Sequence, residues 1–162
     1  MPSPVAVGAA AGLDRLDRSI LRLLQEDGRL SNVDLARRVG LSPSPCLRRV
    51  KALEQRGYIQ RYAAVLSRAL LGRDLVVDVL VNLTDQRQET LAGFEAAVCE
   101  IDDILRCSLI AGDADYLLTV AVENLDAYQR LFSRRLGELP GVASLKSLVT
   151  MKAVKDSRSL PL

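Results

Sequence analysis

Apolar residues recur at helical spacing through the first third of the chain and at alternating spacing farther along. Three helices are predicted between residues 13 and 56, because apolar positions recur every three or four residues between capping residues and glycines. The first helix begins at Asp14 or Asp17 and ends at Gly28. The second begins at the N-cap Ser31 and ends at Gly40, which can adopt the left-handed cap conformation.

The third helix has two possible starts, Ser42-Pro43 and Ser44-Pro45, since each pairs a capping residue with a proline in the first helical position. A helical wheel predicts that Leu47, Val50 and Leu53 face inward. The opposite face is small, polar and basic, and it comprises Ser44, Pro45, Arg48, Ala52 and Gln55, flanked by Arg49 and Arg56. Such a helix after a short glycine turn is typical of a helix-turn-helix, although a generic helical hairpin with a solvated face has similar residues.

The alternating pattern begins near Arg73 and predicts a strand with Leu75, Val77, Val79, Val81 and Leu83 on one face. A helix over residues 86–99, strands over 103–111 and 116–123, a helix opened by Asn124 or Asp126, and a strand over 142–152 are predicted to follow. The inner face of the second of these helices is predicted to comprise Leu125, Tyr128, Phe132 and Leu136.

This order of elements, strand, helix, strand, strand, helix, strand, is typical of a ferredoxin-like domain. The predicted fold class is therefore α+β, with an N-terminal winged helix-turn-helix and a C-terminal ferredoxin-like βαββαβ domain. We expect a disordered tail over residues 1–12, a DNA-binding domain with a short linker or wing over 13–66, and the ferredoxin-like domain over 67–162. Because both faces of its strands are often apolar, we expect another subunit to cover the open face of the sheet.

Charge supports DNA binding by the first domain. The net charge is +2, but residues 1–66 hold 11 Lys+Arg against 6 Asp+Glu, and residues 67–162 hold 11 against 14. The basic half of the chain, at +5, is therefore the half with the predicted helix-turn-helix, where phosphate charge would have to be neutralised.

Composition removes several classes of function. The 162-residue chain has no histidine, which excludes Ser-His-Asp and Cys-His catalysis and histidine metal sites. Its three cysteines have neither metal-ligand nor redox-motif spacing. No apolar run approaches the roughly 20 residues of a membrane helix, and the N-terminus lacks the basic start of a signal peptide. We therefore expect a soluble cytoplasmic protein with no metal site and no membrane partner, while carboxylate chemistry stays open on composition alone.

Three segments together resemble one family. They are LARRVGLSPSPCLRRVKALEQRGYI, GDADYLL between the second and third predicted strands, and LPGVASLKSLVTMKAVKDSRSLPL. In this order they resemble the Lrp/AsnC (leucine-responsive/asparagine-type) transcription regulators over about residues 13–162. The resemblance implies DNA binding by the first domain, pairing of the second into dimers and often rings of eight, and a small effector, commonly an amino acid, bound where dimers meet.

The implied effector loop is Gly112-Asp113-Ala114-Asp115-Tyr116. Gly112 can turn the chain so that backbone N–H groups face a ligand carboxylate, and Asp113 and Asp115 can accept from an ammonium group. Tyr116 either packs in the core or closes the pocket, and Ser147 and Thr150 are further candidate polar groups. A simple hairpin turn is the alternative explanation of the same residues.

Double-stranded DNA is the expected partner of the third predicted helix. Arg48 is the main candidate for reading a base edge, with Ser44 and Pro45 nearby. Arg49 either reads DNA or braces the fold through an acid such as Glu54 or Asp34. The full set of expected DNA contacts is Ser42, Ser44, Pro45, Arg48, Arg49, Lys51, Arg56, Arg37 and Arg38, with Arg61 as a further phosphate contact.

Two other functions fit parts of the sequence. An architectural DNA-binding protein without an effector would share the basic helix and the self-association. Haem-pathway decarboxylases acting on sirohaem also resemble this family, but they depend on histidines, and this chain has none. A regulator of transcription modulated by an amino acid is therefore the favoured hypothesis.

Overall fold

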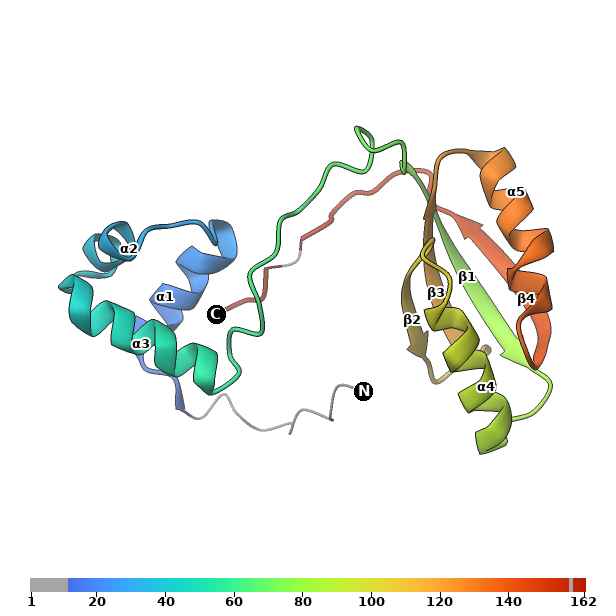
Figure 1. The fold of residues 1–162 in the computed structure, drawn as a ribbon, viewed down its shortest axis with the longest axis horizontal. Helices are drawn as coiled ribbons and strands as arrows, with labels where there is room; N and C mark the ends of the chain where they lie inside the picture. The colour runs from blue at the N-terminus through green and yellow to red at the C-terminus, as the bar shows by residue number, and fades with distance from the viewer. Residues whose placement is uncertain (1–11, 158) are drawn as a thin grey trace. The chain divides into compact units, whose positions relative to one another are not determined.

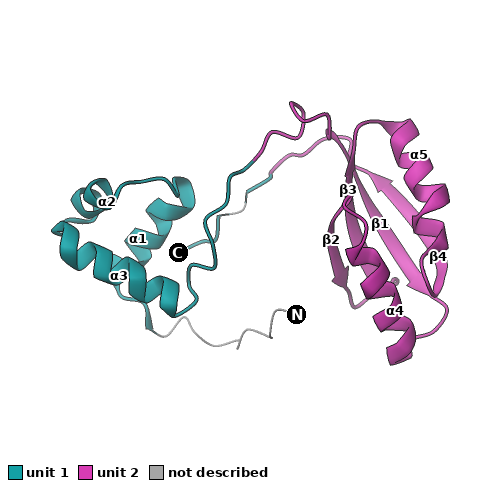
Figure 2. Cartoon of the chain, in the orientation of Figure 1, with its two compact units in different colours: residues 1–65, 156–162 teal, residues 66–155 magenta. Residues whose placement is uncertain are grey.

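A computed structural model of the protein describes residues 12–157 and 159–162. The tail expected over residues 1–12 lies outside the described residues, apart from Gly12. The chain forms two compact units, unit 1 up to Val65 together with Asp156–Leu162, and unit 2 over Leu66–Lys155 (Figure 2). The expected second domain, 67–162, therefore differs from unit 2 in its last seven residues, which return to the first helix of unit 1.

Unit 1 contains three helices, α1 (Arg15–Glu26), α2 (Asn32–Val39) and α3 (Pro43–Gln55) (Figure 1). Of the two acids considered, Asp14 is the N-cap of α1, and its carboxylate accepts from the Asp17 N–H at 2.8 Å. Ser31 caps α2 as expected, and Gly40 ends it with a φ of 73°. Each end follows from capping chemistry within the segment itself, which is why the sequence indicated them.

The core of unit 1 forms where the three helices meet. Its buried members are Ile20, Leu21, Leu35, Ala36, Cys46 and Leu53. In the described structure, residues 59–66 form no strand, so the segment after α3 is a connection without a formed wing. The Tyr62 hydroxyl ties this segment to α3 by donating to Glu54 Oε1 at 3.0 Å, and burial together with this acceptor raises the pKa of Tyr62 to about 12.

A pair of ionic hydrogen bonds joins α3 to α1. Arg49 Nη1 donates to Asp14 Oδ2 at 2.6 Å and to Asp17 Oδ1 at 2.8 Å. The side chain of Asp17 is only 11% exposed, so Arg49 is the cation that compensates a nearly buried carboxylate. Of the two roles considered for Arg49, this geometry favours the brace, but with partners 35 and 32 residues away instead of Glu54 or Asp34.

Unit 2 is a four-stranded sheet with two helices. Its elements are β1 (Leu75–Leu83), α4 (Gln88–Cys99), β2 (Ile104–Leu109), β3 (Tyr116–Val122), α5 (Leu125–Arg134), a 3-10 turn (Leu136–Glu138) and β4 (Val142–Val149). The strands lie in the order β2-β3-β1-β4, and each neighbouring pair is antiparallel. This is the predicted ferredoxin-like arrangement, with β1 and β3 in the centre.

Both helices cover the same face of the sheet (Figure 1). The alternation predicted for β1 is confirmed, because Val77, Val79 and Val81 are fully buried against the helices. The expected inner face of α5 is wrong at Leu125, the first residue of the helix, which is 63% exposed, and Leu131 is buried instead. Leu136 is buried as expected, but it lies in the 3-10 turn after α5.

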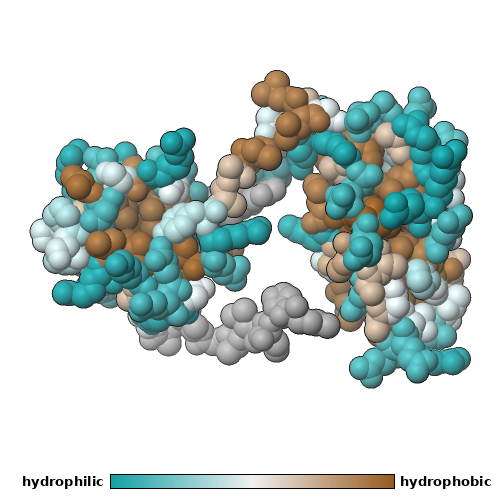
Figure 3. Space-filling model, viewed as in Figure 1, coloured by the Kyte–Doolittle hydropathy of each residue, from teal (hydrophilic) through white to brown (hydrophobic). Residues whose placement is uncertain are grey.

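The other face of the sheet carries no helix. Leu80 of β1 is paired with Leu117 of β3, and the neighbouring Leu148 of β4 is 42% exposed. Polar pairs lie among these leucines, with Thr119 donating to Asp78 at 2.7 Å. Further exposed apolar residues occur where unit 2 begins and after β4; they include Leu66, Leu70, Leu71, Met151 and Val154. Figure 3 shows hydrophobic surface, in brown, over the segment that leads into unit 2.

Replacing Leu131 by Ala should destabilise unit 2 by about 2–5 kcal/mol, because the side chain is 7% exposed and its removal leaves a cavity. Leu125→Ala is the matched control, with the same chemistry on the same helix and an expected cost below about 1 kcal/mol. Urea unfolding followed by circular dichroism measures both. Equal losses would contradict the orientation of α5.

Arg49→Ala should destabilise unit 1 by about 1–3 kcal/mol, because Asp17 loses its partner in a site that water reaches poorly. The hydrogen bond from the Asp17 N–H and the contact with Arg49 lower the pKa of Asp14 below 3.8. A carboxyl group whose pKa is lower in the folded protein than in the unfolded chain stabilises the fold at pH values above its unfolded pKa. This contribution is lost as the pH falls through the folded pKa. The difference between wild type and variant in urea unfolding should therefore shrink below about pH 4, and a difference that grows there would contradict the pairing.

Candidate DNA-binding and effector sites

Helix α3 begins at the earlier of the two starts predicted from the sequence. Ser42 is its N-cap and Pro43 is its first residue, so Ser44 and Pro45 lie in the first turn. Ser42 has the extended backbone of an N-cap but makes no side-chain capping bond. Its hydroxyl is thus not committed to the helix end.

The faces of α3 differ from the helical-wheel prediction at three residues, since Leu47 is exposed while Pro45 and Ala52, predicted to lie on the outward face, are half-buried. Leu47, predicted to face inward, is 43% exposed, whereas Cys46 is fully buried and Leu53 is 1% exposed. The inner face is therefore centred on Cys46, Val50 and Leu53. Cys46 and Leu47 are adjacent apolar residues that lie 100° apart on the wheel, so the pattern does not decide which of them faces inward. Contacts with α1 and α2 decide it.

The exposed face of α3 is defined by Ser44, Leu47, Arg48, Lys51 and Gln55, which are all exposed and lie within about 100° on a helical wheel. In the described part of the chain, Arg48 and Lys51 form no salt bridge. Their charges are thus available to a ligand, and an anionic groove is the kind of surface that such a face fits.

Two other predicted DNA-contact arginines, Arg37 and Arg56, have partners within unit 1. Arg37 lies 3.2 Å from Asp34 in an exposed ion pair, which is weak. Arg56 donates to the Gly12 carbonyl oxygen at 3.2 Å and lies over the Tyr58 ring, 4.9 Å from its centroid. Arg38 on α2 is exposed, with no salt bridge to the described residues. Arg38, Arg48 and Lys51 are therefore the most readily available cations of the predicted set.

One residue of the helix-turn-helix was missed by sequence reasoning. Asn32, the first residue of α2, donates from Nδ2 to the Pro43 carbonyl oxygen at 2.8 Å. This bond joins the beginnings of α2 and α3 and so fixes the turn between them. No local pattern distinguishes Asn32 from an ordinary residue beside a cap, because its acceptor lies 11 residues away.

The predicted effector loop connects β2 to β3, and its two acids have different surroundings. Asp115 Oδ2 accepts from the Leu83 N–H at 2.8 Å, and its Oδ1 accepts from Gln86 Nε2 at 2.9 Å. Both carboxylate oxygens are thus used in holding the loop to the end of β1. Asp113 is exposed, and its carboxylate faces solvent within this chain. Asp113 is therefore the acid of the pair that remains available to a ligand.

The remaining loop positions are partly structural. Gly112 is exposed with a φ of 158°, and Ala114 is 7% exposed. Tyr116 is 1% exposed and packs on Phe94 with ring centroids 4.7 Å apart. Its hydroxyl donates to Glu95 Oε1 at 2.7 Å, and burial followed by this hydrogen bond raises the pKa of Tyr116. Of the two roles considered for Tyr116, packing is the one that the structure has.

The two candidates on and after β4 do not join the loop within one chain. The loop lies beside Val81, whereas the Thr150 N–H donates to the Val76 carbonyl oxygen at the opposite end of β1. Five residues of strand correspond to about 17 Å, which is too far for one small ligand to bridge. Ser147 hydrogen bonds to the Tyr128 hydroxyl on the helical face. Asn82 and Ser144, which were not predicted, lie nearer the loop and are hydrogen bonded at 3.2 Å.

Two further properties bear on what the chain can bind. The described residues contain no group of three or more cysteine, aspartate or glutamate side chains placed to hold a metal ion. None of the helices in the described part of the chain combines the length and apolar character needed to cross a membrane.

Known proteins resemble both units. The winged helix-turn-helix DNA-binding family matches residues 13–60, and the Lrp/AsnC ligand binding domain matches residues 76–160. The chain is 46% identical to the leucine-responsive regulatory protein of Salmonella typhimurium over 148 residues, which cover 91% of this chain and 90% of that protein. It is 45% identical, with the same coverage, to the leucine-responsive regulatory protein of Escherichia coli K12.

Solved structures are similar over nearly the whole chain. A transcriptional regulator from Neisseria meningitidis, solved as a complex with L-methionine, has 38% identity and a TM-score of 0.88, with 92% of this chain and 96% of that chain covered. An AsnC family regulator from Agrobacterium tumefaciens has 36% identity and a TM-score of 0.87, with 92% and 97% covered. These matches confirm the α+β fold and the resemblance predicted from the sequence motifs. The chain belongs to the Lrp/AsnC family and is a transcription regulator that joins a DNA-binding domain of the winged helix-turn-helix family to an effector-binding domain.

Proposed function

We propose that α3 reads specific DNA sequences through its exposed face and that an amino acid bound at the 112–116 loop modulates this binding. The observation that carries the DNA-binding half is the set of available cations on the exposed face. Arg48 and Lys51 lie there without intramolecular salt bridges, while Arg49 holds Asp14 and Asp17. A helix of this kind fits a major groove about 12 Å wide.

Roles within this face follow from side-chain chemistry. Arg48 can donate two parallel hydrogen bonds to O6 and N7 of guanine, and Leu47 offers an apolar contact for a thymine methyl group. Ser42, Ser44 and Pro45 lie at the end of α3 that approaches base edges in helix-turn-helix proteins. Lys51, Arg37, Arg38 and Arg56 are assigned to phosphates, since a phosphate contact needs charge more than a fixed geometry. Arg49 acts in this proposal as a brace that orients α3.

The effector half rests on the free carboxylate of Asp113. It can accept from the ammonium group of an amino acid, while Asp115 keeps the loop in place. The amino-acid class is supported by the leucine-responsive relatives and by the neighbouring structure with L-methionine. Gly112 and Asp113 are exposed in the single chain, so the loop alone does not enclose a ligand. A second chain that completes the site agrees with the family's binding site between dimers.

Self-association is therefore part of the proposal. The face of the sheet without helices carries Leu80, Leu117 and Leu148, and burying such a surface against an equivalent one stabilises a symmetric dimer. Dimers joined into a ring, with eight chains as the expected size, would place two loops at each contact between dimers. The protein would act in the cytoplasm on double-stranded DNA, without a resident cofactor or catalytic activity.

Arg48→Ala should lower discrimination between a preferred site and a guanine-substituted site by about tenfold, because one bidentate base contact contributes about 1–3 kcal/mol. The preferred site is first obtained by selection from random DNA, and affinities are measured by fluorescence anisotropy at several salt concentrations. Lys51→Ala is the matched control. It should weaken all sequences alike and reduce the slope of log K against log salt by about one. A uniform loss of affinity for Arg48→Ala would contradict its base-reading role.

A thermal melt with each common amino acid tests the effector half. An amino acid at about 100 times its dissociation constant stabilises the folded state by about 2.7 kcal/mol, which raises the midpoint by a few degrees. Asp113→Ala should abolish this rise, whereas Asp102→Ala, which removes another exposed carboxylate of unit 2, should retain it. If no amino acid shifts the midpoint, the effector proposal fails and DNA binding without an effector is favoured.

A further inference from the structure

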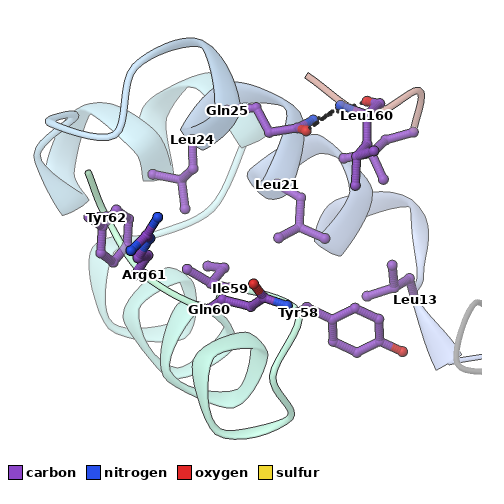
Figure 4. Close-up of a pocket in the computed structure, with 11 residues that line it drawn as sticks. Leu13, Leu21, Leu24, Gln25, Tyr58, Ile59, Gln60, Arg61, Tyr62 and Leu160 are labelled. Atoms are coloured by element: carbon purple, nitrogen blue, oxygen red, sulfur yellow. Dashed lines mark hydrogen bonds between the residues drawn. The ribbon is translucent and has the colours of Figure 1, made fainter. Parts of the chain in front are cut away.

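The segment after β4 returns to unit 1 and binds α1. Gln25, near the end of α1, forms two hydrogen bonds with the backbone of Leu160 (Figure 4). The Leu160 N–H donates to Gln25 Oε1 at 2.7 Å, and Gln25 Nε2 donates to the Leu160 carbonyl oxygen at 3.2 Å. A side-chain amide that satisfies both backbone groups of one residue imitates the pairing of a neighbouring strand. The contact recognises backbone and therefore an extended segment.

Two more contacts extend this docking toward Leu162. Arg22 Nη2, one turn earlier on α1, donates to the Leu162 carbonyl oxygen at 2.7 Å. The Leu162 side chain packs against the core of unit 1. It also lines a cavity of ≈410 Å³ whose other walls include Leu13, Leu21, Leu24, Tyr58 and Tyr62. The end of the chain thus forms one wall of this cavity through Leu160 and Leu162. We call residues 156–162 the return segment.

The return segment limits how far apart the two units can move. Ten residues, 150–159, separate the end of β4 at Val149 from Leu160. Fully extended, ten residues span about 35 Å. While the return segment is docked, the chain connects the units twice, once before β1 and once after β4. Release of the segment would leave only the longer connection between α3 and β1.

Helix α1, which binds the return segment, also contacts α3. Arg22 and Gln25 lie on α1, and the first turn of α1 holds Arg49 of α3 through Asp14 and Asp17. A displacement of α1 therefore changes the position of α3 through short ionic hydrogen bonds. The backbone thus leads from β4 to the return segment, and hydrogen bonds lead from there through α1 to Arg49 of α3.

We propose that residues 156–162 are a second tether, through which the ligand-binding unit restrains the orientation of the DNA-binding unit and passes the effector's influence to it. The coupling rests on the proposed function, because it needs an amino acid that alters DNA binding. The docking of the return segment on α1 does not depend on the proposed function. Released and docked states of the return segment are the two states whose balance the effector shifts.

Hydrogen exchange on the full-length protein tests the docking. In the wild type, the Leu160 amide should exchange at least tenfold more slowly than in Gln25→Ala, which removes its acceptor. Leu162→Asp should release the segment in the same way, because a carboxylate cannot pack in the apolar cavity. Glu26→Ala changes the exposed neighbour of Gln25 and should leave the exchange unchanged. A wild-type Leu160 amide that exchanges as fast as in Gln25→Ala would overturn the tether.

The coupling is tested by the ratio of DNA affinities with and without the amino acid identified in the thermal melts. In Gln25→Ala and Leu162→Asp this ratio should be at least threefold closer to one than the wild-type ratio is. The affinity for the amino acid without DNA, measured by calorimetry, should stay as in the wild type. An unchanged ratio in variants whose return segment exchanges rapidly would overturn the coupling alone. A wild-type ratio of one would instead show that the proposed effector function fails.

Discussion

A sheet covered by helices on only one side sets the organisation of unit 2. Val77, Val79 and Val81 of the central strand β1 are fully buried under α4 and α5, so alternate residues of β1 must face the opposite side. Among the described residues, no layer covers that side. The loop 112–116 lies at the end of β1, where Asp115 fastens it to Leu83 and Gln86. The proposed effector loop and the proposed self-associating face therefore belong to the same sheet.

The division of charged groups between fold and function follows a similar logic. Asp17 and Asp115 are engaged within the fold, since Asp17 is nearly buried beside Arg49 and Asp115 holds the loop before β3 to the end of β1. Chemically similar neighbours are left in solvent, as Arg48 is beside Arg49 and Asp113 is beside Asp115. Removing a paired group leaves its partner without compensation, so those positions are fixed by stability. The exposed neighbours are free to bind DNA or a small molecule.

Local chemistry explains which features the sequence could predict. The cap at Asp14, the glycine at 40 and the alternation of β1 depend on residues within a few positions of one another, and all three are confirmed. The helical wheel failed at Leu47 because Cys46 beside it is equally apolar, and only α1 and α2 determine which one is buried. The partners of Arg49 could not be found because they lie more than 30 residues away. The return of residues 156–162 to Gln25 depends on a contact across 135 residues, and no periodicity reports such a contact.

The central claim is that an amino acid at unit 2 and DNA at unit 1 influence each other through one protein. Thermodynamic linkage makes this claim measurable in both directions. The measurement is the wild-type affinity for DNA with and without the amino acid, together with the affinity for the amino acid with and without DNA. The account predicts that both ratios differ from one and equal each other. An amino acid that binds tightly while leaving the DNA affinity unchanged would contradict it.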